Sequence, residues 1–502
     1  MLDYYIEKNI QNKLELLNIF YADRNITMTD LQISFPLSLT GINTLIDELN
    51  MDFIGLAEIK KQSSYFSLVI YSGTSFMEML HAIYQTSDVL HCLKFMVLND
   101  ENHAFTEFIE TEFLTKSTAY RIKQNCQAYL RRIGLDIKKN CIIGEEYRIR
   151  FLIALLHYKY GIDCYEMNDA DTDIIHNFIL STNETIDRSF LEMTTNEYGF
   201  FNYLLFLSWK RQSYLHSPII SKHLDLCKKL FAYELLKESI RKNLEPNLNI
   251  VFSENDFNYI YLCYCCINNC IFADKWTEKD IKQLHELTFS DKIFSDLLQR
   301  LEHKFGKEIS ASHVVRTTLI YFYRKSLLGL QCITPDKNLY LDAKRSPLTQ
   351  VIFENIAQII EDWRIANHIK YEIDKSHLFY LSLQIELILK HFMKPPPVFI
   401  LSELPSELEV ITLYLDKIFP PNRVTLHSFL ISAENKDAIC SQKQSVMIVN
   451  RKFKYMVEDW KLAEHNTVVP ITVELNSRDL ISVQKAIMYY ETENLLDFVR
   501  RI

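Results

Sequence analysis

The sequence predicts a mainly α-helical, multidomain protein that changes to an α/β domain near its end. Its 502 residues exceed what one hydrophobic core ordinarily organises, so several domains are expected. From residue 1 to about 393, long amphipathic segments carry few Gly or Pro, which favours helices. The run "MKPPPVFIL" then places three prolines at 395–397, where a helix cannot continue.

Beyond Val398, short apolar runs alternate with helical stretches. The apolar runs are "VFIL", "RVTLHSFLI", "SVMIVN" and "VVPITVEL", and the helical stretches are "SELEVITLYLDKIF" and "DLISVQKAIMYYETENLLDFVRRI". Strands that alternate with helices are typical of an α/β sheet domain. We therefore expect such a domain after the prolines.

Glycine is scarce, and its placement disfavours the common nucleotide sites. Only nine glycines occur in 502 residues, and no two of them form GxG, GxxxxGK or GxSxG. Phosphate cradles use glycine where backbone amides approach an anion, so a nucleotide-dependent enzyme is not expected. The chain also lacks HExxH. The sequence therefore predicts no enzyme activity, no cofactor and no metal.

The first residues and the apolar runs bear on location. The start "MLDYYIEKNIQNKLELLNIF" has neither the basic beginning nor the small-residue cleavage site of a secretory signal. No uninterrupted apolar run approaches the roughly 20 residues that cross a bilayer. We expect a cytoplasmic chain with no membrane partner.

Eleven cysteines without a secretory signal are expected to be reduced thiols. In the run "CYCCINNC", Cys263, Cys266 and Cys270 fall at i, i+3 and i+7, which predicts one buried helix face. Metal or redox sensing through these three residues and Cys265 is an alternative.

Two segments repeat at an offset of 77 residues, "TDLQISFPLSLTGINTLIDEL" and "TEFIETEFLTKSTAYRIKQNC". Each starts a short helix at Thr29 or Thr106, carries a Leu in a turn and caps a second helix with Ser38 or Thr115. The apolar steps of the second copy are Ala119, Ile122, Cys126, Leu130 and Ile133. We expect two helix-turn-helix units, each offering its second helix to the DNA major groove. Behind the second copy, "GLDIKKNCIIGEEYRIRFLIALL" predicts strand, basic turn, strand and helix, as in the wing of a winged helix.

Positive charge gathers around the second copy. Between Thr111 and Arg150 lie nine Lys or Arg against four Asp or Glu, in a chain of formal net charge -9. Such an island attracts phosphate while the acidic body repels it, so we expect double-stranded DNA as the partner. The predicted base-reading residues are Ser117, Thr118, Tyr120, Arg121, Gln124 and Asn125. The predicted phosphate contacts are Lys116, Arg131, Arg132, Lys138 and Lys139, and the DNA-binding set also includes Lys123.

The first copy is more acidic. Residues 1–60 carry four Lys or Arg against nine Asp or Glu. Its candidate DNA contacts are Ser38, Thr40, Asn43 and Thr44. This copy either contacts DNA lightly or serves a structural or partner-binding role.

The segment "FLTKSTAYRIKQNCQAYLRRIGLDIKKNCIIGEEYRIRFLIALLHYKYG" resembles the helix-turn-helix of the Mga family of Gram-positive virulence regulators, to which the anthrax toxin activator is also similar. The resemblance implies two N-terminal DNA-binding modules, two helical phosphotransferase-regulation domains and a C-terminal domain similar to sugar-transport enzyme IIB. It also implies a transcriptional regulator that activates and that associates as a homodimer through its C-terminal domain. The domains are placed at 1–60, 61–165, 166–285, 286–393 and 394–502.

The resemblance makes a phosphodonor protein of the sugar phosphotransferase system a candidate partner. A helix of the regulation domains is matched twice, by "NDFNYIYLC" and "SHLFYLSLQ", but Cys263 and Gln384 take the place of the phosphorylatable His. The helical region holds other histidines to consider, namely His176, His216, His223, His285, His303, His313 and His377. The favoured phosphorylation sites among them are His216, His313 and His377.

The C-terminal domain departs from a working enzyme IIB, which carries a nucleophilic Cys after its first strand. Here "VFILSELPSEL" has Ser402 and Glu403 at that place, with no activating base in view. The domain is therefore expected to bind or dimerise. Two other functions stay open: a non-DNA protein-interaction scaffold, and a phosphotransfer protein that accepts phosphate on Cys440 or a C-terminal His.

Overall fold

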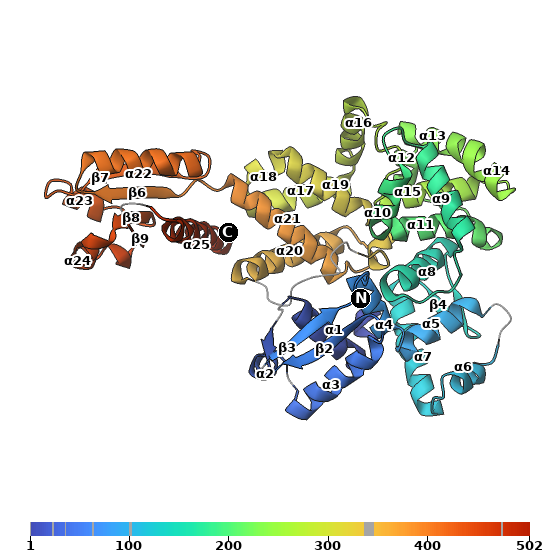
Figure 1. Ribbon diagram of the computed structural model, residues 1–502. Helices are drawn as coiled ribbons and strands as arrows, with labels where there is room; N and C mark the ends of the chain where they lie inside the picture. Colours follow the sequence, from blue (N-terminus) through green and yellow to red (C-terminus); the bar gives the residue numbers. More distant parts are fainter. Residues whose placement is uncertain are drawn as a thin grey trace. The chain divides into compact units, whose positions relative to one another are not determined.

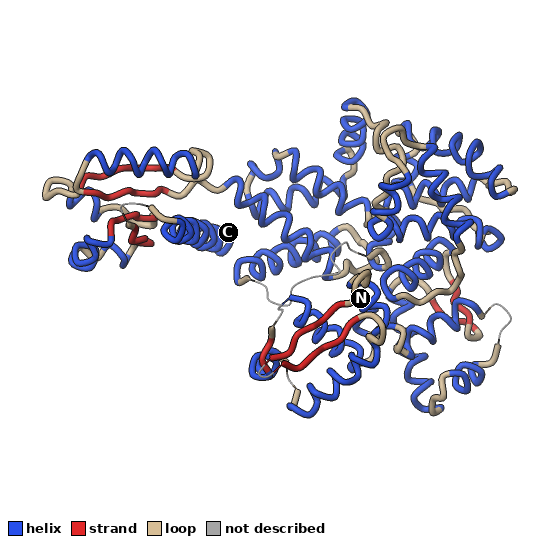
Figure 2. Tube along the Cα trace, in the orientation of Figure 1, coloured by secondary structure: helices blue, strands red, loops and turns tan. Residues whose placement is uncertain are grey.

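The computed structural model describes residues 2–22, 25–35, 37–62, 65–99, 103–335, 346–472 and 475–501. These residues are mainly helical, and their strands form three sheets (Figure 2). The chain packs as two compact units, each described by itself. The first comprises Met1–Leu298, Thr317–Arg345 and Ile360–Leu381, and the second Gln299–Arg316, Ser346–Ile359 and Ser382–Ile502.

The described residues up to Ile70 contain a helix, then a pair of helices joined by a turn, and then an antiparallel hairpin (Figure 1). The elements are η1 (Leu2–Tyr4), α1 (Lys8–Ala22), β1 (Ile26–Thr27), α2 (Met28–Ser34), α3 (Leu39–Asp52), β2 (Ala57–Gln62) and β3 (Tyr65–Ile70). The strand order is β1-β3-β2. The helical pattern does not predict this hairpin, although buried Ala57 and Ile59 alternate with less buried neighbours, the period of a strand. The predicted domain boundary at residue 60 falls inside β2 and stays a prediction.

The next segment repeats this order and contains the basic helix. Its elements are α4 (Phe76–Tyr84), α5 (Asp88–Leu98), α6 (Phe105–Thr111), α7 (Lys116–Arg132), β4 (Asp136–Lys138), β5 (Cys141–Ile143) and α8 (Glu146–Tyr160). Strands β4 and β5 pair antiparallel, with Lys138 opposite Cys141. The predicted order of strand, turn, strand and helix is confirmed. Helix α8 ends at Gly161, whose φ of 67° is the left-handed conformation of a helix C-terminus.

The two repeats share their internal geometry. Ser38 caps α3 by accepting a hydrogen bond from Gly41 N, and Thr115 caps α7 by accepting one from Thr118 N, which is the aligned residue. The aligned apolar pairs are buried in both copies, namely Ile42 with Ala119, Leu45 with Ile122 and Leu49 with Cys126. The first helices start earlier than predicted. Thr27, not Thr29, caps α2 because it forms a capping box with Asp30, and Ala104 precedes α6 in place of Thr106.

Helices make up most of the described chain between residues 169 and 392. They are α9 (Asp169–Ser181), α10 (Arg188–Met193), α11 (Thr195–Lys210), η2 (Gln212–Tyr214), α12 (Lys222–Cys227), α13 (Phe231–Ser239), η3 (Ile240–Leu244), α14 (Glu245–Leu248), α15 (Glu254–Cys266), α16 (Glu278–Phe289), α17 (Lys292–Phe305), α18 (Lys307–Ala311), α19 (His313–Arg324), η4 (Leu327–Cys332), α20 (Pro347–Ala366) and α21 (Lys375–Phe392). Helix α11 packs against α8 and α15. The predicted single helix face of Cys263, Cys266 and Cys270 is correct in burial but wrong in geometry, because α15 ends at Cys266 and the chain is extended at Ile267.

The C-terminal part of the second unit is a parallel sheet with strand order β7-β6-β8-β9 (Figure 1). Its elements are β6 (Pro397–Ser402), α22 (Pro405–Ile418), β7 (Thr425–Leu430), α23 (Lys436–Cys440), β8 (Val446–Asn450), η5 (Arg451–Phe453), α24 (Lys454–Asp459), η6 (Leu462–Glu464), β9 (Thr467–Ile471) and α25 (Ser477–Arg501). Helices α22 and α25 cover one face, through Ile411 and Val483 on Val398 and Ile400, while α23 and α24 cover the other. All four predicted strands are present. Val473 and Glu474, within the last predicted run, lie outside the described residues.

The described residues offer neither a membrane span nor a metal site. None of their helices is long and apolar enough to span a membrane. Within the same residues, no group of three or more His, Cys, Asp or Glu side chains is arranged to hold a metal ion.

Candidate nucleic-acid interface

Helix α7 is fixed by a buried stripe. Ala119, Ile122, Cys126 and Leu130 are at most 5% exposed, as the spacing predicts, and Ile133 at the C-terminal cap is fully buried. The helix packs on α5 through this face. Its opposite face is consequently turned outward, with a fixed orientation.

The outward face of α7 and the β4–β5 turn carry polar side chains that nothing in the described chain satisfies. These side chains are exposed and make no hydrogen bond or ion pair to any described residue; they are Lys116, Arg121, Gln124, Asn125, Lys138 and Lys139. They are six of the predicted DNA contacts. Arg, Gln and Asn are the side chains that pair with base edges in the major groove, and Lys is suited to phosphate.

Four other predicted contacts are engaged locally. The Thr115 hydroxyl lies 3.2 Å from the Ser117 hydroxyl and donates to the Thr118 hydroxyl at 2.9 Å. The side chains of Ser117 and Thr118 therefore belong to the helix cap. The Tyr120 ring is 5.6 Å from the Phe105 ring, although the residue is 53% exposed. Lys123 is half-buried, with its ammonium 4.7 Å from the centre of the Phe105 ring.

Lys123 also fixes the turn between β4 and β5. Its Nζ donates to Asn140 Oδ1 at 2.5 Å. The Asn140 amide donates to His103 O at 3.1 Å, and Asn99 binds the same carbonyl. Lys139 and Asn140 both have positive φ, 52° and 64°, which closes the two-residue turn and leaves Lys139 exposed at its tip.

The C-terminal end of α7 is less open than its sequence predicts. Arg131 Nε lies 3.3 Å from the Asp136 carboxylate. Arg132 pairs with Glu372 and donates to the Tyr5 hydroxyl at 3.4 Å. Both arginines are exposed, but each is already paired with an acid.

The basic island is smaller than the sequence count, because two of its nine cations are buried. Arg148, 3% exposed, donates to Ile133 O at 3.0 Å, to Gly329 O at 3.3 Å and to Leu328 O. Arg150, fully buried, binds Glu146. These two arginines hold the fold together and are removed from the candidate DNA surface.

The first repeat presents a weaker surface of the same kind. Ser38 is used as the cap of α3, and the Thr44 hydroxyl donates to Thr40 O at 3.0 Å, while Asn43 is exposed. Lys13, 5% exposed, neutralises the acidic end of α3 by pairing with Asp52 at 2.8 Å and Glu48 at 3.2 Å. A hydrogen bond from Asn9 and the Lys13 charge lower the pKa of Glu48.

Sequence reasoning missed two cations on the first repeat. Lys60 and Lys61 lie exposed on β2, in the hairpin that follows α3, just as Lys138 lies on the hairpin that follows α7. The alternating pattern of "AEIKKQ" was the signal for the strand that carries them.

The candidate phosphorylation sites differ in access. His216 and His313 are exposed. His377 is 3% exposed, and its Nε2 lies 2.9 Å from Thr334 O. A fourth histidine, His223, was not among the favoured sites; its Nε2 lies 3.1 Å from Asp291, whose carboxylate also accepts the Tyr323 hydroxyl.

Replacing His223 with Gln is expected to remove a pH-dependent contribution to stability. The hydrogen bond with Asp291 raises the pKa of His223, against the effect of burial. Such a histidine stabilises the fold fully below its unfolded pKa of about 6.5, and the contribution is lost as pH rises through the higher folded pKa. Unfolding free energies of the two proteins should therefore converge above that window. The difference stays below about 1 kcal/mol because the side chain is partly exposed, and equal pH profiles would contradict the assignment.

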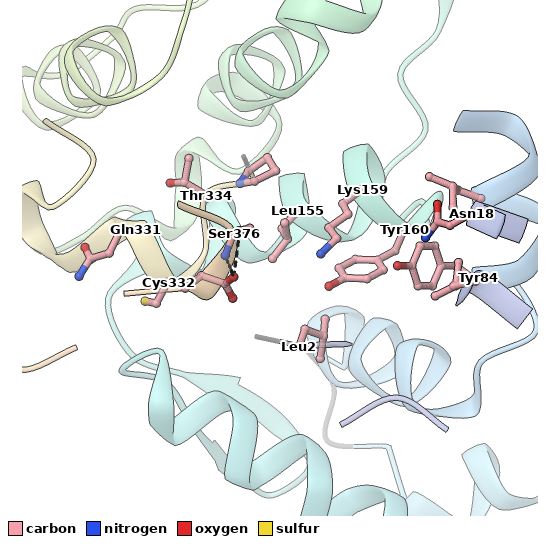
Figure 3. Close-up of a pocket in the computed structure, with 14 residues that line it drawn as sticks. Leu2, Asn18, Tyr84, Leu155, Lys159, Tyr160, Gln331, Cys332, Thr334 and Ser376 are labelled. Atoms are coloured by element: carbon pink, nitrogen blue, oxygen red, sulfur yellow. Dashed lines mark hydrogen bonds between the residues drawn. The ribbon is translucent and has the colours of Figure 1, made fainter. Parts of the chain in front are cut away.

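A cavity of about 170 Å³ lies between α1, α4, α8 and the 331–335 and 374–376 segments (Figure 3). Two of its polar lining residues, Lys159 and Tyr160, both bind Asp3. Lys159 Nζ lies 2.7 Å from Asp3, and the Tyr160 hydroxyl donates to the same carboxylate at 3.2 Å. The charge of Lys159 lowers the pKa of Asp3 although burial opposes it. We assign this cavity no ligand.

The repeated helix pairs and the exposed face of α7 define the class of this protein, which is a DNA-binding protein with a helix-turn-helix. Residues 72–157 match the Mga helix-turn-helix domain, and residues 173–383 match the M protein trans-acting positive regulator (MGA) PRD domain. The two matches together span more than half of the chain, which belongs to the Mga family of transcriptional regulators. The resemblance found in the sequence is thereby confirmed. The comparison with curated proteins gave no match.

Proposed function

We propose that this regulator reads duplex DNA as a winged helix-turn-helix, with α7 in the major groove and the β4–β5 hairpin as the wing. One observation carries the proposal, namely the set of exposed side chains on α7 and the hairpin that have no partner in the described chain. Arg121, Gln124 and Asn125 are assigned to base edges, and Lys116, Lys138 and Lys139 to phosphates. The first repeat assists through Asn43 and the lysines of β2.

The experiment selects a binding site from a pool of random duplexes and then compares Arg121→Ala with the wild type on that site. A bidentate contact to a base is worth about 1 to 3 kcal/mol, so affinity should fall and discrimination at one base position should relax. Arg188→Ala is the matched control because Arg188 is an exposed arginine on α10. Equal losses in the two variants would mean a general charge effect, and no loss at all would remove α7 from the interface.

Replacing Lys139 with Gly is expected to separate stability from binding. Lys139 has a φ of 52°, and removing the side chain relieves a left-handed conformation that costs about 1 kcal/mol. The variant should unfold at a higher temperature yet bind DNA more weakly. Lys139→Gln, which removes the charge and keeps the backbone preference, should weaken binding to the same extent with no gain in stability. Undiminished binding in both variants would show that the tip does not contact DNA.

We infer a homodimer held through the C-terminal domain, which we regard as similar to enzyme IIB. Helix α22 exposes Val410, Leu413 and Tyr414, and these residues follow one helical face without a covering element among the described residues. A dimer would set two recognition helices about 34 Å apart, or a multiple of it. Light scattering of Leu413→Asp should give a monomer where the wild type gives a dimer; dimers in both would place the contact elsewhere.

The matched PRD domain supports regulation by phosphate from a phosphodonor protein of the sugar phosphotransferase system. His216 and His313 are accessible to such a donor, whereas His377 is buried and bonded to Thr334 O. Acid-labile phosphate is therefore expected on one of the two exposed histidines and not on His377. The words "positive regulator" in the name of the matched domain support activation, and DNA as the partner supports the cytoplasm.

The phosphotransfer alternative has one new observation in its favour and one against it. The expectation that Ser402 lacks a nearby base is wrong, because its hydroxyl donates to the Glu407 carboxylate at 2.5 Å. Ser402 is nevertheless 1% exposed, and its oxygen also accepts a hydrogen bond from Leu404 N at 3.3 Å. A buried hydroxyl with both partners in place is poorly suited to attack a phosphoryl donor.

A further inference from the structure

The turn of the second helix-turn-helix holds a residue in a backbone conformation that its type rarely adopts. Helix α6 ends at Thr111, and Phe113, two residues further on, has a φ of 53°. The Phe113 N–H donates to Glu110 O at 3.4 Å, and the Leu114 N–H donates to Ile109 O at 3.0 Å. These two bonds form the Schellman motif of a helix end, in which the left-handed residue is usually glycine because a side chain there is strained.

The end of helix α7 shows the same motif with glycine in this position. Gly134 has a φ of 82°, and its N–H donates to Arg131 O at 3.3 Å, while the Leu135 N–H donates to Leu130 O at 2.8 Å. The end of α6 therefore carries Phe113 where the end of α7 carries glycine. A bulky residue held in a strained backbone conformation indicates a function for its side chain.

The Phe113 side chain contributes nothing to the packing of the fold. The residue is 94% exposed, the highest value among the large apolar residues of the described chain. Exposure of one apolar residue is common, but a strained backbone at a bulky residue is rare. The two features together leave the folded chain without a reason of its own for a phenylalanine at this position.

The position of Phe113 favours the bases of DNA as its contact. It lies three residues before Lys116, the first residue of α7. In helix-turn-helix proteins the N-terminal residues of the second helix contact base edges, so the turn before it lies at the groove. Glu110 is exposed beside the turn, and its charge disfavours a phosphate contact there. The major groove also displays the methyl group of thymine, which phenylalanine is suited to contact.

We propose that Phe113 is a specificity-determining residue that reads the methyl group of one thymine in the target site. The inference rests on the proposed function, in which α7 enters the major groove. The ring covers the methyl group and removes apolar surface of both partners from water, and burial of one methyl group changes affinity by about fourfold. The hydrogen-bonded turn holds the ring in place before binding, which reduces the entropy lost on contact.

The test replaces each thymine of the selected duplex in turn by deoxyuridine, which lacks only the methyl group. Fluorescence anisotropy compares the full-length wild type with Phe113→Gly and Phe113→Leu. The wild type should lose about fourfold in affinity at one thymine, whereas Phe113→Gly should bind the parent duplex about fourfold more weakly and lose nothing further there. Phe113→Leu keeps an apolar side chain and should retain most of the preference for the methyl group. Phe113→Gly should also unfold at a higher temperature, because the strain is relieved.

Arg121→Ala separates the failure of this inference from the failure of the proposed function. If Arg121→Ala weakens binding but no deoxyuridine position distinguishes Phe113→Gly from the wild type, the thymine contact is refuted and DNA binding by α7 stands. If neither substitution weakens binding, both proposals fail. If Phe113→Gly binds every duplex as the wild type does but changes transcription from a promoter that carries the site, the ring contacts a protein partner and the inference is overturned.

Discussion

Replacing Glu146 with Gln is expected to destabilise the first unit by about 3 to 5 kcal/mol. The Glu146 carboxylate lies 2.8 Å from Arg211 Nε and 3.1 Å from Arg150 Nε, and the two arginine side chains are 4% and 0% exposed. Removing its charge leaves two buried guanidinium groups without an anion, which costs far more than the loss of an exposed pair. The effect is large because Arg150 Nη1 already lacks a hydrogen-bond partner.

Urea unfolding of Glu146→Gln beside Glu145→Gln measures this effect. Glu145 is the adjacent residue, is exposed and makes no side-chain capping bond, so its substitution should stay within about 0.5 kcal/mol of the wild type. An unfolding midpoint that is equal in all three proteins would show that Glu146 does not hold the cluster. The cluster joins α8, within the matched helix-turn-helix domain, to Arg211, within the matched PRD domain.

Replacing Arg148 with Met is expected to cost about 2 to 4 kcal/mol of stability, because three backbone carbonyls lose their donor in a buried site. The guanidinium also stacks on Tyr371, 4.2 Å from the ring centre, and Met keeps only part of this packing. Since one of the three carbonyls belongs to Ile133, the cap of α7, DNA affinity should fall as well.

Thermal unfolding and DNA affinity are measured together for Arg148→Met, with Arg188→Met as the exposed control. Loss of DNA affinity with unchanged stability would mean that Arg148 contacts DNA after all and is not a structural residue. If neither the thermal stability nor the DNA affinity changes, the structural role assigned to buried Arg148 is contradicted.

The elements that the sequence predicted best are those in which local chemistry and packing agree. The Thr115 cap and the buried residues of α7 follow from spacing alone, and so do the strands after the prolines. The hairpin after α3 was missed because its apolar alternation is short and its polar half resembles a helix end. It carries Lys60, one of only four cations counted over residues 1–60, and Lys61, which lies just beyond that range.

Burial of charge was the larger limit on predicting the site. Arg148 and Arg150 belong to the same basic run as Arg121 and Lys139, and nothing local separates them. Their partners, such as Gly329 and Arg211, lie far away in sequence.

The salt dependence of DNA binding tests the central claim most directly. Fluorescence anisotropy on the selected duplex would compare the wild type with a variant in which Lys116, Arg121, Lys138 and Lys139 are all replaced by Gln. Each phosphate contact contributes about 0.9 to the slope of log K against log salt, so the loss of the three lysines assigned to phosphates should reduce the slope by about 3. The loss of the Arg121 base contact should weaken binding further. Equal slopes in the two proteins, with both folded, would show that DNA is bound by another surface.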